Sequence, residues 1–243
     1  KGQSFADKHQ LDMTFIQADA LSQNVSQYIH REQHAVALHA CGDLHVRLIE
    51  IAAKQKIQAL TISPCCYHLT QDDIYQPLSK EARQGQLTLS KQELRIPLQK
   101  TVTGGARVRR HRQLEMSYRL ALAKLIQHLT GEKAYVPIPS IQKSKLADGF
   151  QAFCEWAIAQ KNLNLDLSLV EDFDAWQALG ETMFWQMEAL GLVQGLYKRA
   201  IETWLLLDKA LFLQSEGYDV TLGQFCSQEV TPRNLYLQAK RID

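Results

Sequence analysis

Apolar and polar residues alternate along the first third of the chain in a way that predicts strands and helices in turn. Three short apolar runs have the length and composition of buried β-strands. They are Met13–Ala18, Ala35–His39 and Ile57–Ser63. Pro64 is expected to stop the third strand, and helices are predicted between the strands at Ser22–Arg31 and Leu44–Lys56. Nearly continuous apolar strands separated by helices are typical of a parallel sheet covered on both faces, so the pattern predicts an α/β fold.

The middle of the chain has a mainly helical pattern. Val108–Leu129 is predicted to form one long helix, and Lys143–Gln160 and Phe173–Ser215 predict further helices. A break in the last of these is expected near Gly191 or Gly195. Six aromatic residues at roughly helical spacing are expected to form the core of this helical part. They are Trp156, Phe173, Trp176, Phe184, Trp185 and Trp204.

The end of the chain returns to strand-like patterns at Asp219–Phe225 and Leu235–Ala239, with Pro232 in the connecting turn. The two runs predict a hairpin-like antiparallel addition to the sheet. The predicted organisation is therefore a Rossmann-like core interrupted by a large helical insertion before its last two strands. The expected bounds are 1–76 for the core, 77–217 for the insertion and 218–243 for the closing strand pair.

Composition adds little to the assignment of function but narrows the class of protein. The 243 residues are 46% hydrophobic with a formal net charge of +1, which is ordinary for a globular protein and favours no nucleic acid by bulk charge. The five cysteines lack the even count and regular spacing of a disulfide framework. No apolar run approaches the roughly 18–20 residues that span a bilayer. These features predict a cytoplasmic protein with reduced thiols.

Polar segments follow each of the three predicted strands of the core. They are Asp19, His39–Leu44 and Ser63–His68. In open α/β sheets ligands bind at the carboxyl ends of the strands, so these segments are expected to line one cleft. Each also has a simpler explanation: Asp19 and Asp43 are good helix-capping residues, and buried cysteines often serve only as small apolar side chains.

The motifs HACGDL at 39–44 and SPCCYH at 63–68, in this order and separation, resemble a branch of the class I S-adenosylmethionine-dependent methyltransferases. This branch includes bacterial proteins and eukaryotic methyltransferase-like proteins, among them the one named for a glutathione S-transferase C-terminal domain. The closing segment 229–241 resembles the last strand region of the same branch. A more distant likeness is to tRNA 2′-O-methyltransferases. The resemblance covers roughly residues 1–75 and 218–243, and the helical middle matches none of it.

The resemblance implies roles for particular residues. Asp19 and Ala20 would lie beside the adenine of the cofactor, and His39, Ala40 and Cys41 beside its methionine moiety. Pro64 and the residues after it would face the substrate. The implied catalytic candidates are His39, Asp43, Cys65, Cys66, Tyr67 and His68.

The glycine-rich loop and the ribose-binding acid of that family, which follow its first and second strands, have no counterpart in this sequence. We therefore expect the chain to be N-terminally truncated, and to bind S-adenosylmethionine weakly or not at all on its own.

Several chemistries are open to the candidates at the strand ends. His39, His68 and Asp43 are candidate bases, and Tyr67 is a candidate for stacking or hydrogen bonding. Cys65 or Cys66 could attack a pyrimidine ring as a thiolate, although packing is the commoner role. The cysteines with Cys41 and His68 could instead form a zinc site, but neither segment has C-x₂-C spacing, and the sequence predicts no metal.

The stretch Lys100–Arg112 carries the clearest local charge, with five basic residues and no acid. The arginines expected to bind substrate phosphates are Arg107, Arg109, Arg110 and Arg112. Cations are disfavoured at a helix N-terminus, which favours an anionic partner such as RNA. The alternative is a solvated helix start whose arginines pair with acids such as Glu115.

The sequence thus supports three hypotheses of function. The first is a methyltransferase acting on tRNA or rRNA, which the basic stretch favours. The second is a methyltransferase acting on a protein or a small molecule. The third is a non-catalytic binding or scaffold protein that keeps the fold, which the polar residues at the strand ends argue against.

Overall fold

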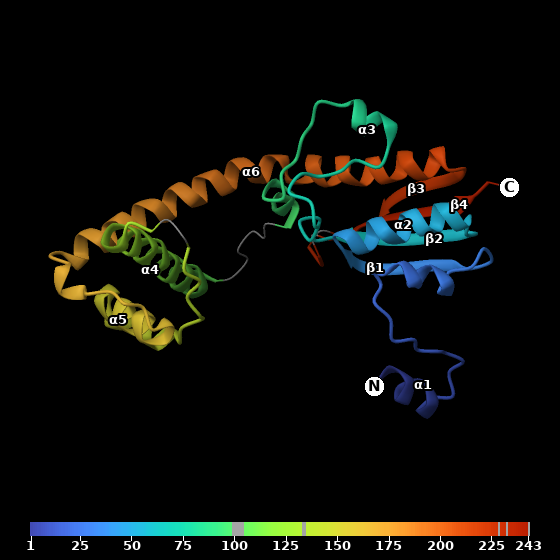
Figure 1. Ribbon diagram of the computed structural model, residues 1–243. Coiled ribbons are helices and arrows are strands. Elements are labelled where there is room, and N and C mark those ends of the chain that lie inside the picture. The colour runs from blue at the N-terminus through green and yellow to red at the C-terminus, as the bar shows by residue number, and fades with distance from the viewer. Residues whose placement is uncertain (99–104, 133–134, 228, 232, 243) are drawn as a thin grey trace. The chain divides into compact units, whose positions relative to one another are not determined.

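The computed structural model describes residues 1–98, 105–132, 135–227, 229–231 and 233–242 (Figure 1). The chain forms two compact units. The first consists of Lys1–Gln99 and Tyr197–Asp243, and the second of Lys100–Leu196. The unit that contains the sheet thus extends past residue 76, the expected end of the core. It also resumes at Tyr197, inside the long helix Phe173–Ser215 and before the expected end of the insertion at residue 217.

The first unit contains a mixed four-stranded sheet with helices, so the fold is α/β. Its elements are α1 (Gly2–Lys8), η1 (Gln23–Tyr28), β1 (His34–Cys41), α2 (Asp43–Gln55), β2 (Ala59–Cys65), α3 (Lys80–Gln84), η2 (Glu93–Leu98), the end of α6 (Phe173–Ser215), β3 (Tyr218–Gln224) and β4 (Leu235–Arg241). The strand order is β1-β2-β4-β3. β1 and β2 are parallel, and β4 runs antiparallel to both β2 and β3, as predicted for the closing pair. Pro232, expected in the turn between β3 and β4, lies outside the described residues.

One face of the sheet packs against helices. Alternate residues of the four strands share a core with α2 and the end of α6. Residues paired across strands, such as Leu60 with Ala239 and Ile62 with Leu237, point to the same side of the sheet. The strand residues of this face are Ala35, Ala37, Leu60, Ile62, Val220, Leu222, Leu235, Leu237 and Ala239. Because both helices lie on this one side, the expectation of a sheet covered on both faces is wrong for the described residues. Val36 and Leu38 on the opposite face are exposed.

The strand predicted at Met13–Ala18 does not form. These residues have no regular structure and are exposed, including the apolar side chains of Met13, Phe15 and Ile16. An apolar run becomes a strand only when a neighbouring strand satisfies its backbone, and the ladder recorded for β1 is with β2 alone. The helix predicted at Ser22–Arg31 is likewise reduced to the short 3₁₀ turn η1.

The strand β2 continues through Pro64 to Cys65, so the expected stop at Pro64 is wrong. The proline pairs with Ala40 of the parallel strand β1. Proline is compatible with a strand end because only its own N–H is lost from the ladder.

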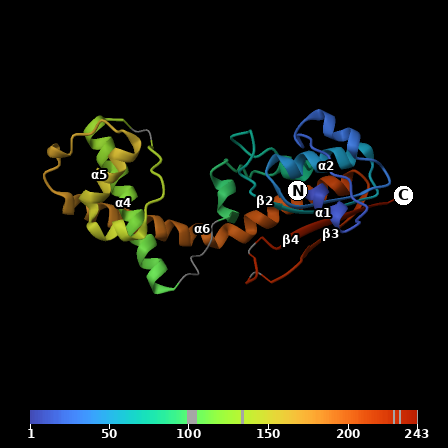
Figure 2. The ribbon, with the colours of Figure 1, turned by 90° about the horizontal axis from the view of Figure 1, so that it is seen from below.

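The second unit is helical (Figure 2). It contains α4 (Ala106–Thr130), η3 (Lys143–Asp148), α5 (Phe150–Lys161), η4 (Leu167–Leu169) and the start of α6. The long helix predicted at Val108–Leu129 is confirmed, and it ends at Gly131 in the left-handed conformation that glycine favours. The helix predicted at Lys143–Gln160 is divided by Gly149, whose φ of 95° interrupts the helical path. α4 and α6 approach closely at Gly180, where an added Cβ would lie 2.2 Å from the carbonyl oxygen of Ser117.

The helix α6 runs without interruption through Gly191 and Gly195, so the predicted break there is wrong. A glycine costs roughly 1 kcal/mol in a helix interior relative to alanine, which is too little to end a long helix by itself. Within the described ranges, no helix has both the length and the apolar character needed to cross a bilayer.

The aromatic residues of the helical part only partly form one core. Trp156, Phe173 and Trp176 pack against the buried cluster of the second unit, and Phe184 is buried. Trp185 is 59% exposed, and Trp204 belongs to the first unit, where it packs with Tyr75. The prediction is therefore wrong for Trp185 and Trp204. Spacing along a helix does not show which of the two units each turn of the helix packs against.

We expect Leu60→Ala to lower the free energy of unfolding of the first unit by about 2–5 kcal/mol, since Leu60 is fully buried between neighbours that cannot close the cavity. Leu38→Ala is the matched control, because Leu38 lies on the adjacent strand with 68% of its surface exposed, and its loss should cost well under 1 kcal/mol. Urea unfolding of both variants measures the difference. Equal destabilisation would contradict the assignment of the sheet faces.

Candidate functional site

The two motif segments form one structure at the carboxyl ends of β1 and β2. Cys41 and Cys65 are register partners, and the N–H of Gly42 donates to the carbonyl of Cys65 at 3.1 Å. The N–H of Asp43 donates to the carbonyl of Leu69 at 3.1 Å, and a carboxylate oxygen of Asp43 accepts the N–H of Gln71 at 2.9 Å. The chain after β2 is thereby attached to the start of α2.

Gly42 makes this junction possible. It is the N-cap residue of α2 with a φ of 53°, and an added Cβ would lie 1.8 Å from the carbonyl oxygen of Leu69. No residue with a side chain fits there, because both the backbone conformation and the space exclude it. Asp43 is the first helical residue rather than the cap, and its carboxylate serves the loop after β2.

A bulge at His39 sets the direction of the side chains that follow it. The register between β1 and β2 shifts between Leu38 and Ala40, and His39 adopts a φ of 56°. Since side chains alternate along a strand, one inserted residue moves Cys41 from the face of Ala35 and Ala37 to the opposite face. His39 itself is exposed at the edge, whereas Ala40 is buried.

Tyr67 turns away from this exposed edge. It is 4% exposed, packs edge-on against His45 at a centroid distance of 5.6 Å, and lies 5.4 Å from Nζ of Lys209. His45 Nδ1 lies 3.1 Å from the carbonyl of Ala40, so α2, β1 and α6 all contact the space behind the motifs. Tyr67 therefore supports the site from the inside in this structure.

A buried charged network continues from Tyr67 into α6. The hydroxyl of Tyr75 donates to Asp208 at 2.6 Å, and Nζ of Lys209 donates to Tyr75 at 2.9 Å and to the carbonyl of Leu205 at 3.0 Å. Asp208 also accepts the N–H of Ser79 at 2.8 Å and its hydroxyl at 2.7 Å. The predictions from the strand ends do not include this network. The sequence does carry a signal for it, because Asp208 and Lys209 interrupt an otherwise apolar helical run.

Burial shifts the proton affinities of this region. It lowers the pKa of Lys209 to about 8, against the opposing effect of Asp208. Burial and then the charge of Lys209 hold the pKa of His45 well below 6.5. Burial also raises the pKa of Cys65 and Cys66, with further increases from the neighbouring Cys41 thiol.

His68 is the other titratable side chain at the strand ends. It is half-buried, and burial followed by the positive charges of Arg95 and Lys91 lowers its pKa. Its Nδ1 atom is shielded from solvent and has no hydrogen-bond partner among the described residues. A neutral imidazole accepts a proton at one ring nitrogen, and with Nδ1 shielded that atom would be Nε2.

The structure does not join every predicted site residue to the strand ends. Asp19 and Ala20 are exposed, and a carboxylate oxygen of Asp19 accepts the N–H of Leu21 at 3.0 Å, which is a local turn contact. The predicted phosphate-binding arginines lie in the second unit. They are Arg107, Arg109, Arg110 and Arg112, all on α4.

Part of this basic stretch is neutralised within its own unit. Arg112 donates to Glu188 at 2.8 Å and its guanidinium lies 5.6 Å from the ring centroid of Phe184. Arg107 and Arg110 are exposed near the start of α4. Residues 100–104, including Lys100, lie outside the described residues.

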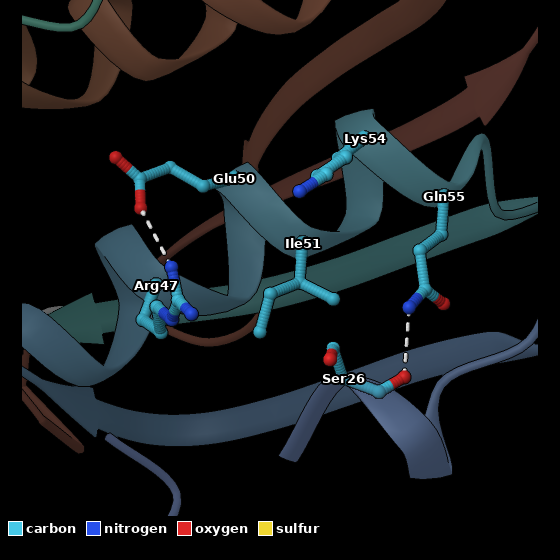
Figure 3. A pocket seen from close by; sticks show the side chains of 6 residues that line it. All are labelled: Ser26, Arg47, Glu50, Ile51, Lys54 and Gln55. Carbon is cyan, nitrogen blue, oxygen red and sulfur yellow. Dashed lines mark hydrogen bonds and ion pairs between the residues drawn. The ribbon is translucent and has the colours of Figure 1, made fainter. Parts of the chain in front are cut away.

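A pocket lies between η1 and the side of α2 (Figure 3). Its lining residues are Ser26, Arg47, Glu50, Ile51, Lys54 and Gln55. Nε2 of Gln55 donates to the carbonyl of Ser26 at 2.7 Å, and Arg47 pairs with Glu50 at 3.7 Å. None of the predicted site residues lines it, so we do not assign it to the candidate site.

Comparison with known families supports a methyltransferase. Residues 1–73 match the model of a methyltransferase domain. This segment ends within the loop between β2 and α3, and it therefore includes both motif segments and the bulge at His39. No solved structure matches the chain.

We expect the stability of the first unit to fall as the pH drops below about 6.5, because the unfolded chain then protonates His45 while the folded chain does not. Through His45, the free energy of unfolding changes by at most about 1.4 kcal/mol per pH unit. This dependence stops once the pH is below the pKa that His45 has in the folded protein. The groups facing His45 are Tyr67, Lys209 and the carbonyl of Ala40.

His45→Gln removes the titration while keeping a polar side chain of similar size. Urea unfolding of both proteins between pH 7.5 and 5 tests the expectation, since contributions from other groups cancel in the comparison. The wild-type midpoint should fall more steeply with decreasing pH. Parallel curves for the two proteins would refute the assignment of His45 as buried and neutral.

Proposed function

We propose that this protein is a class I, S-adenosylmethionine-dependent methyltransferase with a Rossmann-like sheet, and that its substrate is RNA. The observation that carries the enzymatic part is the match of residues 1–73 to a methyltransferase domain, since that segment contains both motifs at the strand ends. The parallel pair β1 and β2 with α2 between them supports the Rossmann-like assignment, because ligands of such sheets bind at the carboxyl ends of the strands.

The residues fit one end of the cofactor better than the other. His39, Ala40 and Cys41 lie together at the end of β1, beside the N-terminus of α2, as binding of the methionine moiety requires. Asp19 and Ala20 lie in a segment that joins no strand, and Asp19 already accepts a local N–H. When bound, S-adenosylmethionine would supply a sulfonium methyl group.

The task left to the protein is to position a nucleophile and remove its proton. His68 is the candidate that we favour for this role, because it is half-buried at the strand ends and its lowered pKa keeps the imidazole neutral. Since Nδ1 is shielded from solvent, Nε2 would be the atom that takes the proton. His39 stands at the exposed edge of the same strand ends. Asp43 is partly committed to Gln71, and the raised pKa of Cys65 and Cys66 keeps both as thiols, which are weak nucleophiles.

Transfer from tritiated S-adenosylmethionine to total RNA and, separately, to total protein tests the reaction and the substrate class. Isothermal calorimetry with S-adenosylhomocysteine first measures whether the protein binds the cofactor. Where it does, we expect label in RNA, and we expect His68→Gln to reduce the label by about 10²–10⁴-fold if His68 acts as the base. His9→Gln, an exposed histidine on the segment after α1, is the control and should keep the wild-type rate. Label in protein alone would exclude RNA as the substrate. Label in neither, from protein that binds S-adenosylhomocysteine, would argue for a scaffold.

The RNA proposal rests on Arg107 and Arg110, which are exposed near the start of α4, where the helix dipole disfavours cations unless an anion binds. The double variant Arg107→Glu/Arg110→Glu should weaken binding to tRNA and reduce the slope of log affinity against log salt by roughly 2. Fluorescence anisotropy over a range of salt concentrations measures both. Lys124→Glu, exposed further along the same helix, is the control. Unchanged affinity in the double variant would rule out this role.

A further inference from the structure

Three thiols meet at the carboxyl ends of β1 and β2. The Sγ atoms of Cys41, Cys65 and Cys66 all lie within 4.8 Å of one another, and those of Cys41 and Cys65 are 3.4 Å apart. All three are free cysteines. Cys65 is buried, whereas Cys41 and Cys66 are half-exposed, so the group lies at the protein surface with one side open to solvent.

Two unusual backbone conformations produce this arrangement. The bulge at His39, with a φ of 56°, places Cys41 opposite Cys65 and on the same face of the sheet. Without it, Ala40 would pair with Cys65. Cys66 has a φ of 49°, which ends the alternation of the strand and allows two adjacent cysteines to converge.

Left-handed conformations of residues other than glycine each cost of order 1–3 kcal/mol and are concentrated at functional sites. Mere packing of small apolar side chains would not require two of them beside the same three sulfur atoms. These two conformations are what bring the three sulfur atoms together.

The spacing of the sulfur atoms suits a metal ion. Zinc–thiolate bonds of about 2.3 Å in tetrahedral geometry separate the sulfur atoms by about 3.8 Å, which lies within the observed range. Three thiolates on a divalent ion leave a net charge of −1. The N-terminus of α2, which begins two residues after Cys41, and the positive charge of Arg233 near Cys66 both favour that charge.

We propose that Cys41, Cys65 and Cys66 bind one thiophilic d¹⁰ metal ion, Zn²⁺, with the fourth position left to water or an external ligand. Binding exchanges the three thiol protons for the metal ion, and no electron is transferred. Three protein ligands with an open position are typical of zinc sites that engage a further ligand rather than purely structural ones. The metal site shares Cys41 with the proposed cofactor site, but its test measures metal binding alone, so the failure of one proposal can be told from the failure of the other.

The test uses the chain purified and kept under reductant without oxygen. We expect one equivalent of zinc per chain by elemental analysis, and thiolate-to-metal charge-transfer absorption on titration with Co²⁺. Cys41→Ser and Cys66→Ser should each weaken Zn²⁺ binding by more than the roughly 10–100-fold that loss of an outer-shell contact costs. These half-exposed positions are chosen because the substitutions leave the buried Cys65 in place.

Cys226→Ser is the matched control, since Cys226 is also half-exposed but lies outside the group of three. It should bind Zn²⁺ and Co²⁺ as the wild type does. The proposal is overturned if the reduced wild type gives no charge-transfer band, or if Cys41→Ser and Cys66→Ser retain zinc as well as Cys226→Ser. A disulfide between Cys41 and Cys65 in a protein that takes up no Co²⁺ when reduced would assign the group to thiol oxidation instead.

Discussion

The register between β1 and β2 is the constraint on which the candidate site depends. Up to Leu38 the two strands pair in simple parallel register, and the residues of β1 that face the helices are small or apolar. The extra residue at His39 reverses the side on which later residues project. Ala40 thereby enters the core beside His45, and Cys41 leaves it. A single inserted residue thus separates a packed strand from a polar strand end.

The segment after β2 is held in place from two directions. From the exposed side, Gly42 and Asp43 bond to Cys65, Leu69 and Gln71 through backbone and carboxylate contacts. From the inside, α6 supplies a buried lysine and aspartate. A buried charge costs several kcal/mol unless it is paired and hydrogen-bonded, so this network is stable only while its members keep their positions. It ties the end of α6 to the loops after β2 and leaves Tyr67 little freedom to rotate outward.

Much of the local structure follows from the sequence, and the exceptions have physical causes. The prediction succeeds for the strands at residues 35–39 and 57–63 and for the helix between them. In these segments the spacing of apolar residues and the position of turn residues indicate the same element bounds. Met13–Ala18 has the same apolar character but pairs with no strand among the described residues, and propensity alone does not make a strand. The convergence of the two motifs is also predictable, because the ends of adjacent parallel strands meet. The bulge at His39 and the left-handed conformation of Cys66 are not predictable from the sequence, since neither residue is a glycine and only tertiary contacts hold them.

The cysteines also bear on how a methyl transfer at these strand ends would work. As thiols, Cys65 and Cys66 have raised pKa values because burial and neighbouring sulfur atoms disfavour a thiolate. As metal ligands, their lone pairs would be engaged. In neither state is a free thiolate ready to attack a ring carbon, so covalent catalysis through cysteine is the least favoured of the chemistries at this site. Catalysis would then rest on orientation and proton transfer at His39 and His68, with the sulfur atoms defining the shape and charge of the adjacent surface.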